Sequence, residues 1–180
     1  MSYGFITRTL QKEFLKAKVP VEKHKDPEVI TLNGNENQSE TLYFWQLHSI
    51  LGTDRIQALI TNFYQRVFND RIAGFGEIFQ SLGSMEHHIQ GQTSFWQDAM
   101  GGGKRYAGGE FRLKRHHDLA KHIMNTRGAA RWSHHMRDTL SDLSVDLTSD
   151  KRVRKCIITF INFFMEKYAE EYDFKIVSRL

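Results

Sequence analysis

The sequence holds a single cysteine, Cys156, which excludes an internal disulfide. It also has no apolar run long enough to span a membrane and no apolar core of a secretory signal peptide, so we expect a soluble protein in the reducing cytoplasm. Proline occurs only at positions 20 and 27. Because everything after residue 28 lacks the strongest helix breaker, the sequence favours an all-α body.

A strong charge of one sign is also missing, since the chain carries a net charge of only +4. A balance this mild is typical of a solvated surface, and no segment has the aromatic and basic pattern of a nucleic-acid recognition motif. We therefore expect neither nucleic acid nor a membrane as the partner. Hydrophobic residues make up 40% of the chain and aromatic ones 12%, which is enough for a substantial aromatic core.

Two regions differ in composition. Residues 1–40 contain both prolines and the polar run 33–39, and we predict an extension with a short amphipathic helix that places Phe5, Leu10, Phe14, Leu15 and Val19 on one face. The only alternating pattern is a weak one at Val29–Leu32. Residues 41–178 are predicted to form one helical domain. Its expected helices cover residues 42–50, 54–68, 84–100, 111–120, 127–143 and 150–172, with 71–83 as a connection.

The most informative segment is 101–132, where His116 and His117 lie among clustered basic residues. An imidazole beside cations suggests a group that offers a metal to the histidine and an anion to its neighbours. A haem iron with its two propionates meets both needs. The cations available for the propionates are Lys104, Arg112, Lys114 and Arg115.

Polar side chains also interrupt the apolar faces of three expected helices. His88 and Gln92 share a face with Met85, Ile89, Phe95 and Trp96, and Tyr64 and Trp132 lie on apolar faces of two other helices. Burying an unpaired polar group costs roughly 1–3 kcal/mol, so a shared polar ligand would explain all four. The alternatives are faces half open to solvent and backbone carbonyl partners for the Tyr and Trp donors.

The histidine pair itself allows three interpretations. The first is surface histidines in a basic loop, which would suit a helical interaction module. The second is a metal-dependent phosphohydrolase built on His117-Asp118, with further ligands from His87, His88, His122 or Asp138. The third is a single axial histidine for haem.

The segment from about Leu42 to Tyr172 resembles the truncated (two-over-two) haemoglobins, most closely those of group II. The landmarks that carry the resemblance occur in order along the chain: Phe63-Tyr64 within NFYQRVFND, Phe95 before Met100-Gly101-Gly102, Tyr106, Arg115-His116 with Leu119 three residues later, and AARWSHHM before the last helix. The resemblance implies a globin-like, two-over-two helical sandwich around haem b.

It also implies a role for each matching position. His116 corresponds to the proximal iron ligand, Tyr64 to the distal tyrosine, and Trp132 to the distal tryptophan. His88 and Gln92 correspond to distal positions, and His88 is a candidate sixth ligand in the gas-free state. The haem-contacting set implied in this way is Tyr64, Phe79 (with Phe75 as its alternative), His88, Gln92, Phe95, Tyr106, Arg115, His116 and Trp132. The proline-containing turn that usually follows the ligand is missing, so His117 stays a rival and His122 a more distant one.

The function implied is reversible binding of O2, and of NO or CO. Several hydrogen-bond donors around the gas would slow its release, which suits ligand chemistry, detoxification or sensing better than bulk oxygen transport. Any enzymatic activity would be of the NO dioxygenase or peroxidase kind, served by a reductase. The sequence leaves open a homodimer.

Overall fold

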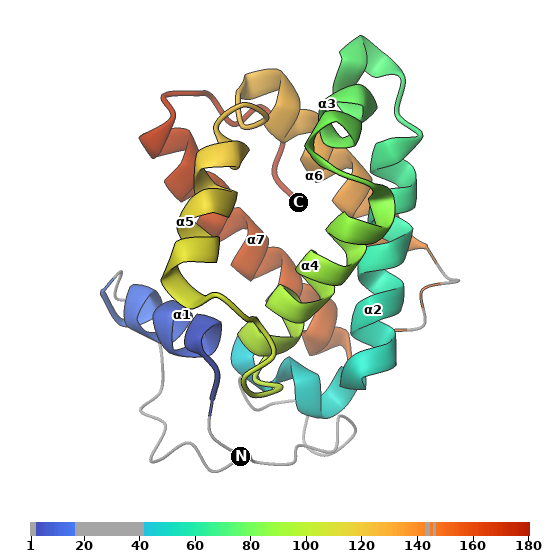
Figure 1. The fold of residues 1–180 in the computed structure, drawn as a ribbon. Helices are drawn as coiled ribbons and strands as arrows, with labels where there is room; N and C mark the ends of the chain where they lie inside the picture. The colour runs from blue at the N-terminus through green and yellow to red at the C-terminus, as the bar shows by residue number, and fades with distance from the viewer. Residues whose placement is uncertain (1–2, 17–41, 143–144, 146) are drawn as a thin grey trace.

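The computed structural model describes residues 3–16, 42–142, 145 and 147–180. Within these ranges the chain forms helices and no strand, as the sequence predicts. The helices, shown in Figure 1, are α1 (Phe5–Lys16), α2 (Leu47–Phe68), α3 (Phe75–Leu82), α4 (Met85–Ala99), α5 (Gly109–Ala120), α6 (Thr126–Ser141) and α7 (Lys151–Glu171), with short 3₁₀ turns at Phe44–Gln46 and Ile72–Gly74.

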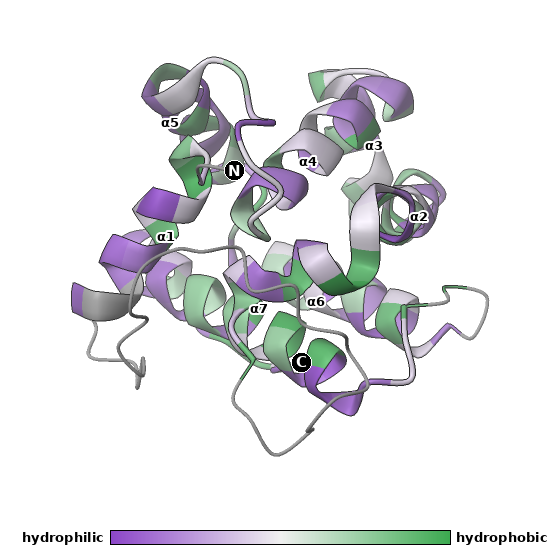
Figure 2. Cartoon of the chain, turned by 90° about the horizontal axis from the view of Figure 1, so that it is seen from below, coloured by the Kyte–Doolittle hydropathy of each residue, from purple (hydrophilic) through white to green (hydrophobic). Residues whose placement is uncertain are grey.

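The helices enclose one hydrophobic core. α2 packs against α3, α4 and α6, while α1 packs against α4. In Figure 1, α4 and α5 face each other across the middle of the molecule, and α6 and α7 lie behind them. Figure 2 shows that α7 is largely hydrophobic where it passes through the centre. Its inward stripe of Val153, Ile157, Phe160 and Ile161 is buried, as the helical spacing predicts.

Polar caps fix where three helices begin. Ser84 Oγ accepts a hydrogen bond from the backbone N–H of His87, and the side chains of Asn125 and Asp150 cap α6 and α7 in the same way. The predicted break at Gly52 is a kink within α2, where this glycine takes a φ of 68°. A left-handed φ of this kind suits glycine because it has no Cβ to clash.

Residues 71–83, predicted as a connection, form instead a 3₁₀ turn and the helix α3. The prediction was wrong because the glycines of this segment play two structural roles, at the ends of a helix and inside it. Gly74 and Gly83 have positive φ values and bound the helix, whereas Gly76 lies inside it. A Cβ on Gly76 would come within 2.6 Å of the carbonyl oxygen of Asp70, so this glycine permits α3 to pack closely on the end of α2.

The predicted amphipathic helix in the extension exists as α1, but its buried face differs. Ile6, Thr7 and Leu10 are buried, whereas Phe5 is exposed because it lies outside the i, i+4 pair that packs inward. The side chains of Phe14 and Leu15, all of Val19 and the weak pattern at Val29–Leu32 lie outside the described residues. The domain limits 1–40 and 41–178 stay a prediction.

A buried carboxylate attaches α1 to the rest of the fold. Asp98 Oδ1 accepts hydrogen bonds from the backbone N–H groups of Ile6 (3.1 Å) and Thr7 (3.2 Å), while Oδ2 accepts one from the N–H of Tyr106 (3.3 Å). Asp98 is completely buried. This one side chain therefore connects the start of α1, the end of α4 and the loop that leads to α5.

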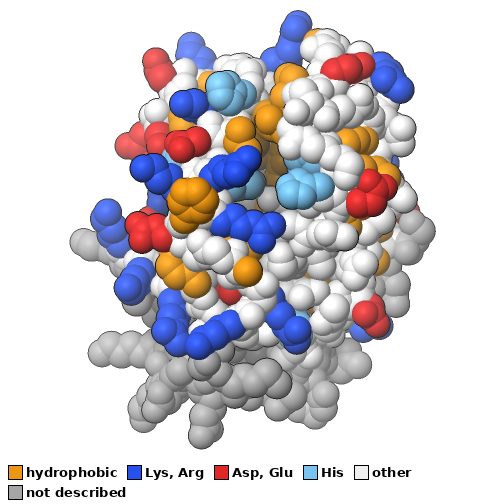
Figure 3. Space-filling model, viewed as in Figure 1, with side chains coloured by type: hydrophobic (Ala, Val, Ile, Leu, Met, Phe, Trp, Pro, Cys, Tyr) orange, Lys and Arg blue, Asp and Glu red, His pale blue; other side chains and the backbone are white. Residues whose placement is uncertain are grey.

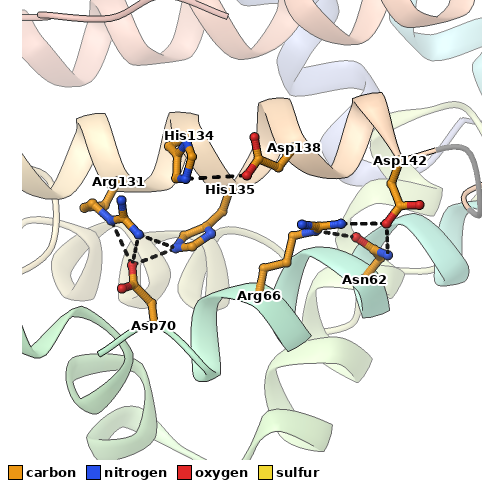
Figure 4. Close-up of polar contacts among 8 residues, drawn as sticks. All are labelled: Asn62, Arg66, Asp70, Arg131, His134, His135, Asp138 and Asp142. Atoms are coloured by element: carbon orange, nitrogen blue, oxygen red, sulfur yellow. Dashed lines mark hydrogen bonds and ion pairs between the residues drawn. The ribbon is translucent and has the colours of Figure 1, made fainter. Parts of the chain in front are cut away.

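Two polar clusters fasten α6 to α2, as Figure 4 shows. At one end, Asp70 accepts hydrogen bonds from Arg131 Nε (2.8 Å) and His135 Nε2 (2.7 Å). At the other end, Asp142 pairs with Arg66 (2.5 Å) and Asn62 (3.2 Å). Together they fix the position of α6 along α2. Among the residues that the structure describes, no helix is long and apolar enough to cross a bilayer.

Candidate functional site

A cavity of about 610 Å³ lies between α4 and α5. Its walls come from α2, α3, α4, α5, α6 and α7, and α1 closes one side with Ile6, Thr9, Leu10 and Glu13. Most of the lining is hydrophobic, including Phe63, Phe95, Phe160 and Met136. Figure 3 shows a hollow with hydrophobic side chains in its depth and histidines at its edge.

All of the haem-contacting residues implied by the sequence line this one cavity: Tyr64, Phe79, His88, Gln92, Phe95, Tyr106, Arg115, His116 and Trp132. They come from α2, α3, α4, α5, α6 and the loop before α5, so the fold gathers positions that are far apart in the sequence. Phe75, the alternative to Phe79, does not line the cavity but packs behind it, with the two ring centroids 5.2 Å apart.

The imidazole of His116 projects from α5 toward α4. Its Nε2 accepts a hydrogen bond from the Gln92 amide (3.0 Å), and its ring stacks on Phe95 with centroids 6.3 Å apart. The side chain is exposed to the open cavity, but the protein packed close around it removes part of its hydration. This burial, together with the nearby His117, His88 and Arg112, lowers the pKa of His116 to about 4. At neutral pH the ring is therefore uncharged and has a lone pair on Nε2.

His117, the rival, lies on another side of α5. Its Nε2 donates to Glu171 of α7 (2.7 Å), and its ring lies 5.4 Å from that of Tyr172, whose hydroxyl donates to the His117 carbonyl. His117 does not line the cavity, and neither does His122. Successive residues on a helix point about 100° apart, and on α5 this rotation turns His117 toward α7 while His116 faces the cavity.

His88 and Gln92 line the opposite wall on α4. His88 Nε2 donates to the backbone carbonyl of Phe79 (3.1 Å), and its ring lies 5.3 Å from the ring of Tyr64. Burial lowers the pKa of His88 and outweighs the hydrogen bond to Phe79, which acts in the opposite direction. The polar residues on this helical face therefore point into the cavity and not into bulk solvent.

Tyr64 and Trp132 form a third group with Phe63 between them. The Phe63 ring centroid lies 5.2 Å from that of Tyr64 and 4.9 Å from that of Trp132. Tyr64 is only 5% exposed, and burial raises the pKa of its phenol. Neither its hydroxyl nor the Trp132 indole N–H donates to another residue within the described ranges. Two donors thus face the cavity without a protein acceptor.

The mouth of the cavity is basic. Arg112 and Arg115 line it, and the Arg112 guanidinium lies 4.9 Å from the ring centroid of Tyr106. The other two cations expected to hold an anion, Lys104 and Lys114, are exposed and do not line the cavity. Lys114 is therefore left out of the lining although Leu113 and Arg115 on either side of it contribute to it.

Three lining elements were not identified from the sequence. The inward face of α1 is one, although the i, i+4 spacing of Ile6 and Leu10 was a usable signal. The others are His87 and Phe111, which also line the cavity. Phe111 is 78% exposed, an unusual position for a phenylalanine.

The ligand set required by a metal phosphohydrolase does not assemble within the part of the chain that the structure describes. No three His, Cys, Asp or Glu side chains gather there closely enough to hold a metal ion. His117 is paired with Glu171, and Asp138 lies 3.4 Å from the exposed His134. Cys156 is half-buried on α7, and burial raises the pKa of its thiol to about 12, so it is not activated as a nucleophile.

Comparisons with known proteins agree with this geometry. The sequence profile of the family described as bacterial-like globin matches residues 46–167. Two-on-two hemoglobin-3 of Arabidopsis thaliana is 35% identical over 107 residues, 58% of this chain and 58% of that protein. Group 2 truncated hemoglobin 3-1 of Lotus japonicus is 32% identical over 119 residues, 63% of this chain and 64% of the relative. The chain thus matches less than two thirds of the length of each relative.

Proposed function

Because the chain belongs to the bacterial-like globin family and resembles group 2 truncated haemoglobins, we propose that it holds haem b between α4 and α5 and binds a diatomic gas there. The observation that carries the proposal is the convergence of Tyr64, His88, His116 and Trp132 on one cavity from four different helices.

The residues of the cavity suit a haem group. A volume of about 610 Å³ lies within the range of roughly 300–1,000 Å³ that is usual for cofactor sites. The lining is mainly apolar, as a flat macrocycle requires. The uncharged His116 would offer its Nε2 lone pair to iron once the Gln92 amide that donates to it moves aside, and Arg112 and Arg115 at the mouth suit two propionates.

When bound, haem would supply an iron able to take O2, NO or CO in the part of the cavity that α2 and α6 line. On that side the chain presents the Tyr64 hydroxyl and the Trp132 indole N–H, both still without a described acceptor. His88 and Gln92 line the same wall and can assist. Each hydrogen bond to the gas must break before the gas leaves, so these donors slow its release.

We therefore propose a protein suited to ligand chemistry, detoxification or sensing, in preference to bulk oxygen transport. NO dioxygenase and peroxidase activities are the enzymatic forms that such a site supports. We also propose a cytoplasmic location, a reductase as a partner and a homodimer.

His88 is the candidate sixth ligand to iron in the gas-free state. Its Nε2 already donates to the Phe79 carbonyl, which holds that atom away from the centre of the cavity. We therefore propose a hydrogen-bonding role for His88. A six-coordinate low-spin spectrum that disappears in His88→Ala would contradict this role.

The direct test is an ultraviolet–visible spectrum of the purified protein supplied with haem, reduced and exposed to carbon monoxide. The proposal predicts a Soret band that shifts with carbon monoxide. A colourless protein that takes up no haem but carries a divalent metal would support the phosphohydrolase instead. Absence of both, with salt-sensitive binding to an anionic partner, would support the interaction module.

A further inference from the structure

The positive charge of the chain is concentrated beside the cavity. Residues 104–122 hold six Lys and Arg side chains and two acidic ones, Glu110 and Asp118. This balance of +4 equals the net charge of the whole chain, so the remaining 19 basic and 19 acidic residues cancel. Figure 3 shows Lys and Arg side chains gathered around hydrophobic ones next to the hollow.

Only some of these basic side chains line the cavity. Arg112 and Arg115 line it and are the cations that two propionates would use. The other four, Lys104, Arg105, Lys114 and Lys121, are exposed and do not line it. A haem group therefore leaves about two thirds of the cations in this segment without an anionic partner.

The chain does not neutralise them either. None of the six cations forms an ion pair with a carboxylate among the described residues. Some cations elsewhere do find carboxylates, as in Arg71–Glu77 and Arg179–Glu166, whereas the exposed Lys151, Arg154 and Lys155 of α7 form no ion pair with a described carboxylate. Unpaired like charges on one short helix repel one another, which an anionic partner would relieve.

An exposed aromatic ring lies among these basic side chains. Phe111 is 78% exposed at the cavity mouth, and Lys114 and Arg115 follow it at i+3 and i+4 on the same side of α5. An apolar centre with a charged rim is the usual composition of a protein–protein interface. Aromatic residues at such centres contribute most of the binding free energy.

We propose that Phe111 with Lys104, Arg105, Lys114 and Lys121, the basic mouth surface, docks an acidic protein that carries single electrons. This inference rests on the proposed haem function, because an iron site that binds O2 must be returned to its ferrous state. The partner loses one electron and ferric iron gains it, and no bond or proton is exchanged. The mouth is where the haem edge would come closest to a docked protein.

Opposite charges would bring such a partner to the surface faster than random collision. Electrostatic steering of this kind raises association rates by about 10–10³-fold and weakens steeply with salt. A small anion would need no exposed phenylalanine. A membrane or nucleic acid would need a broader basic face, whereas the basic residues of 104–122 lie on one short helix, the residue after it and the loop before it.

The test uses a reduced ferredoxin, a small acidic one-electron carrier, as the probe. Its affinity for the full chain and its rate of reducing the ferric haem-loaded protein are measured between about 0.02 and 0.3 M salt, where the Debye length falls from roughly 20 to 6 Å. The variant is Lys104→Glu/Lys114→Glu/Lys121→Glu. The control is Lys151→Glu/Arg154→Glu/Lys155→Glu, which changes the net charge equally.

The control residues are exposed at the start of α7, while the far end of that helix carries Glu171, which bonds to α5. Since 21 helical residues span roughly 30 Å, the two sites are well separated. We expect affinity and reduction rate to fall at least tenfold in the mouth variant and less than about threefold in the control. Phe111→Ala should weaken binding without changing the salt dependence.

Equal losses in the two triple variants, or binding that does not depend on salt, would overturn the proposal. So would tighter binding to phosphatidylserine vesicles or duplex DNA than to ferredoxin. Carbon monoxide spectra and helical circular dichroism of each variant separate a docking defect from loss of haem or of the fold. Ferredoxin binding by the haem-free chain tests the surface even if the protein fails to take up haem.

Discussion

The imidazole of His116 is uncharged at neutral pH because the fold around it disfavours a positive charge. Burial is the main cause, and His117, His88 and Arg112 add to it. In the unfolded chain the same histidine would take its ordinary pKa near 6.5. Between that value and about 4, the unfolded chain binds a proton that the folded chain refuses. Folding therefore becomes less favourable as the pH falls through this window.

We predict that His116→Ala reduces this loss of stability. Denaturant unfolding of the haem-free protein between about pH 4 and 7 should show a shallower decline in the free energy of unfolding for the variant than for the wild type. Parallel declines would show that His116 does not carry the effect. His122→Ala is the matched control, because His122 is exposed and does not line the cavity.

Removal of the Tyr64 hydroxyl tests the role of the distal side of the cavity. We predict that Tyr64→Phe speeds O2 release by about two- to tenfold, since one hydrogen bond contributes about 0.5–1.5 kcal/mol. Tyr106→Phe serves as the control, because Tyr106 lies at the mouth beside Phe95 and Arg112. Stopped-flow displacement of O2 by carbon monoxide measures both rates. A fast O2 off-rate in the wild type that Tyr64→Phe leaves unchanged would exclude this role.

At the scale of elements, α6 is held on α2 by two charge clusters, one formed by Arg131 and His135 on either side of Trp132 and the other by Asp142 just after the helix. Asp70 has a side chain only 1% exposed and binds Arg131 and His135, which flank Trp132 on the same helix. Burial alone would raise the pKa of Asp70, but hydrogen bonds from His135, the Ile72 N–H and Arg131 lower it. The carboxylate is therefore ionised in the folded protein.

We predict that Asp70→Ala lowers the free energy of unfolding by about 3 kcal/mol, since it leaves Arg131 and His135 without their common partner. Asp138→Ala breaks only the exposed contact with His134 on the same helix and should cost less than about 0.5 kcal/mol. Chemical denaturation measures both values. Similar small losses in the two variants would show that the buried cluster does not fasten α6 to α2.

The sequence predicts the long helices well and the short one poorly, for a physical reason. α2 and α7 each bury one regular apolar stripe, and polar caps such as Ser84 and Asn125 define where α4 and α6 begin. α3 contains only eight residues, and a glycine in so short a segment, such as Gly76, is more typical of a turn than of a helix. Gly76 is instead needed because α3 packs closely on the end of α2, and the local sequence does not reveal this tertiary contact.

For the whole molecule, the sequence identified some features of the candidate site, and only the folded structure determined the others. The resemblance identified each cavity-lining candidate in advance, yet neither the basic segment nor the spacing distinguished His116 from His117. The rotation of α5 makes the distinction, because it turns His116 toward Gln92 and His117 toward Glu171. The part that α1 plays in closing the cavity depends on buried Asp98, whose partners lie about ninety residues away in the sequence.

The most direct test of a haem site between α4 and α5 is a comparison of His116→Ala with His117→Ala. Each variant is supplied with haem, reduced and exposed to carbon monoxide, and its absorption spectrum is recorded against the wild type. The structure predicts that His116→Ala loses the wild-type Soret band or changes its character, while His117→Ala keeps it. A spectrum that survives His116→Ala and fails in His117→Ala would contradict the assignment.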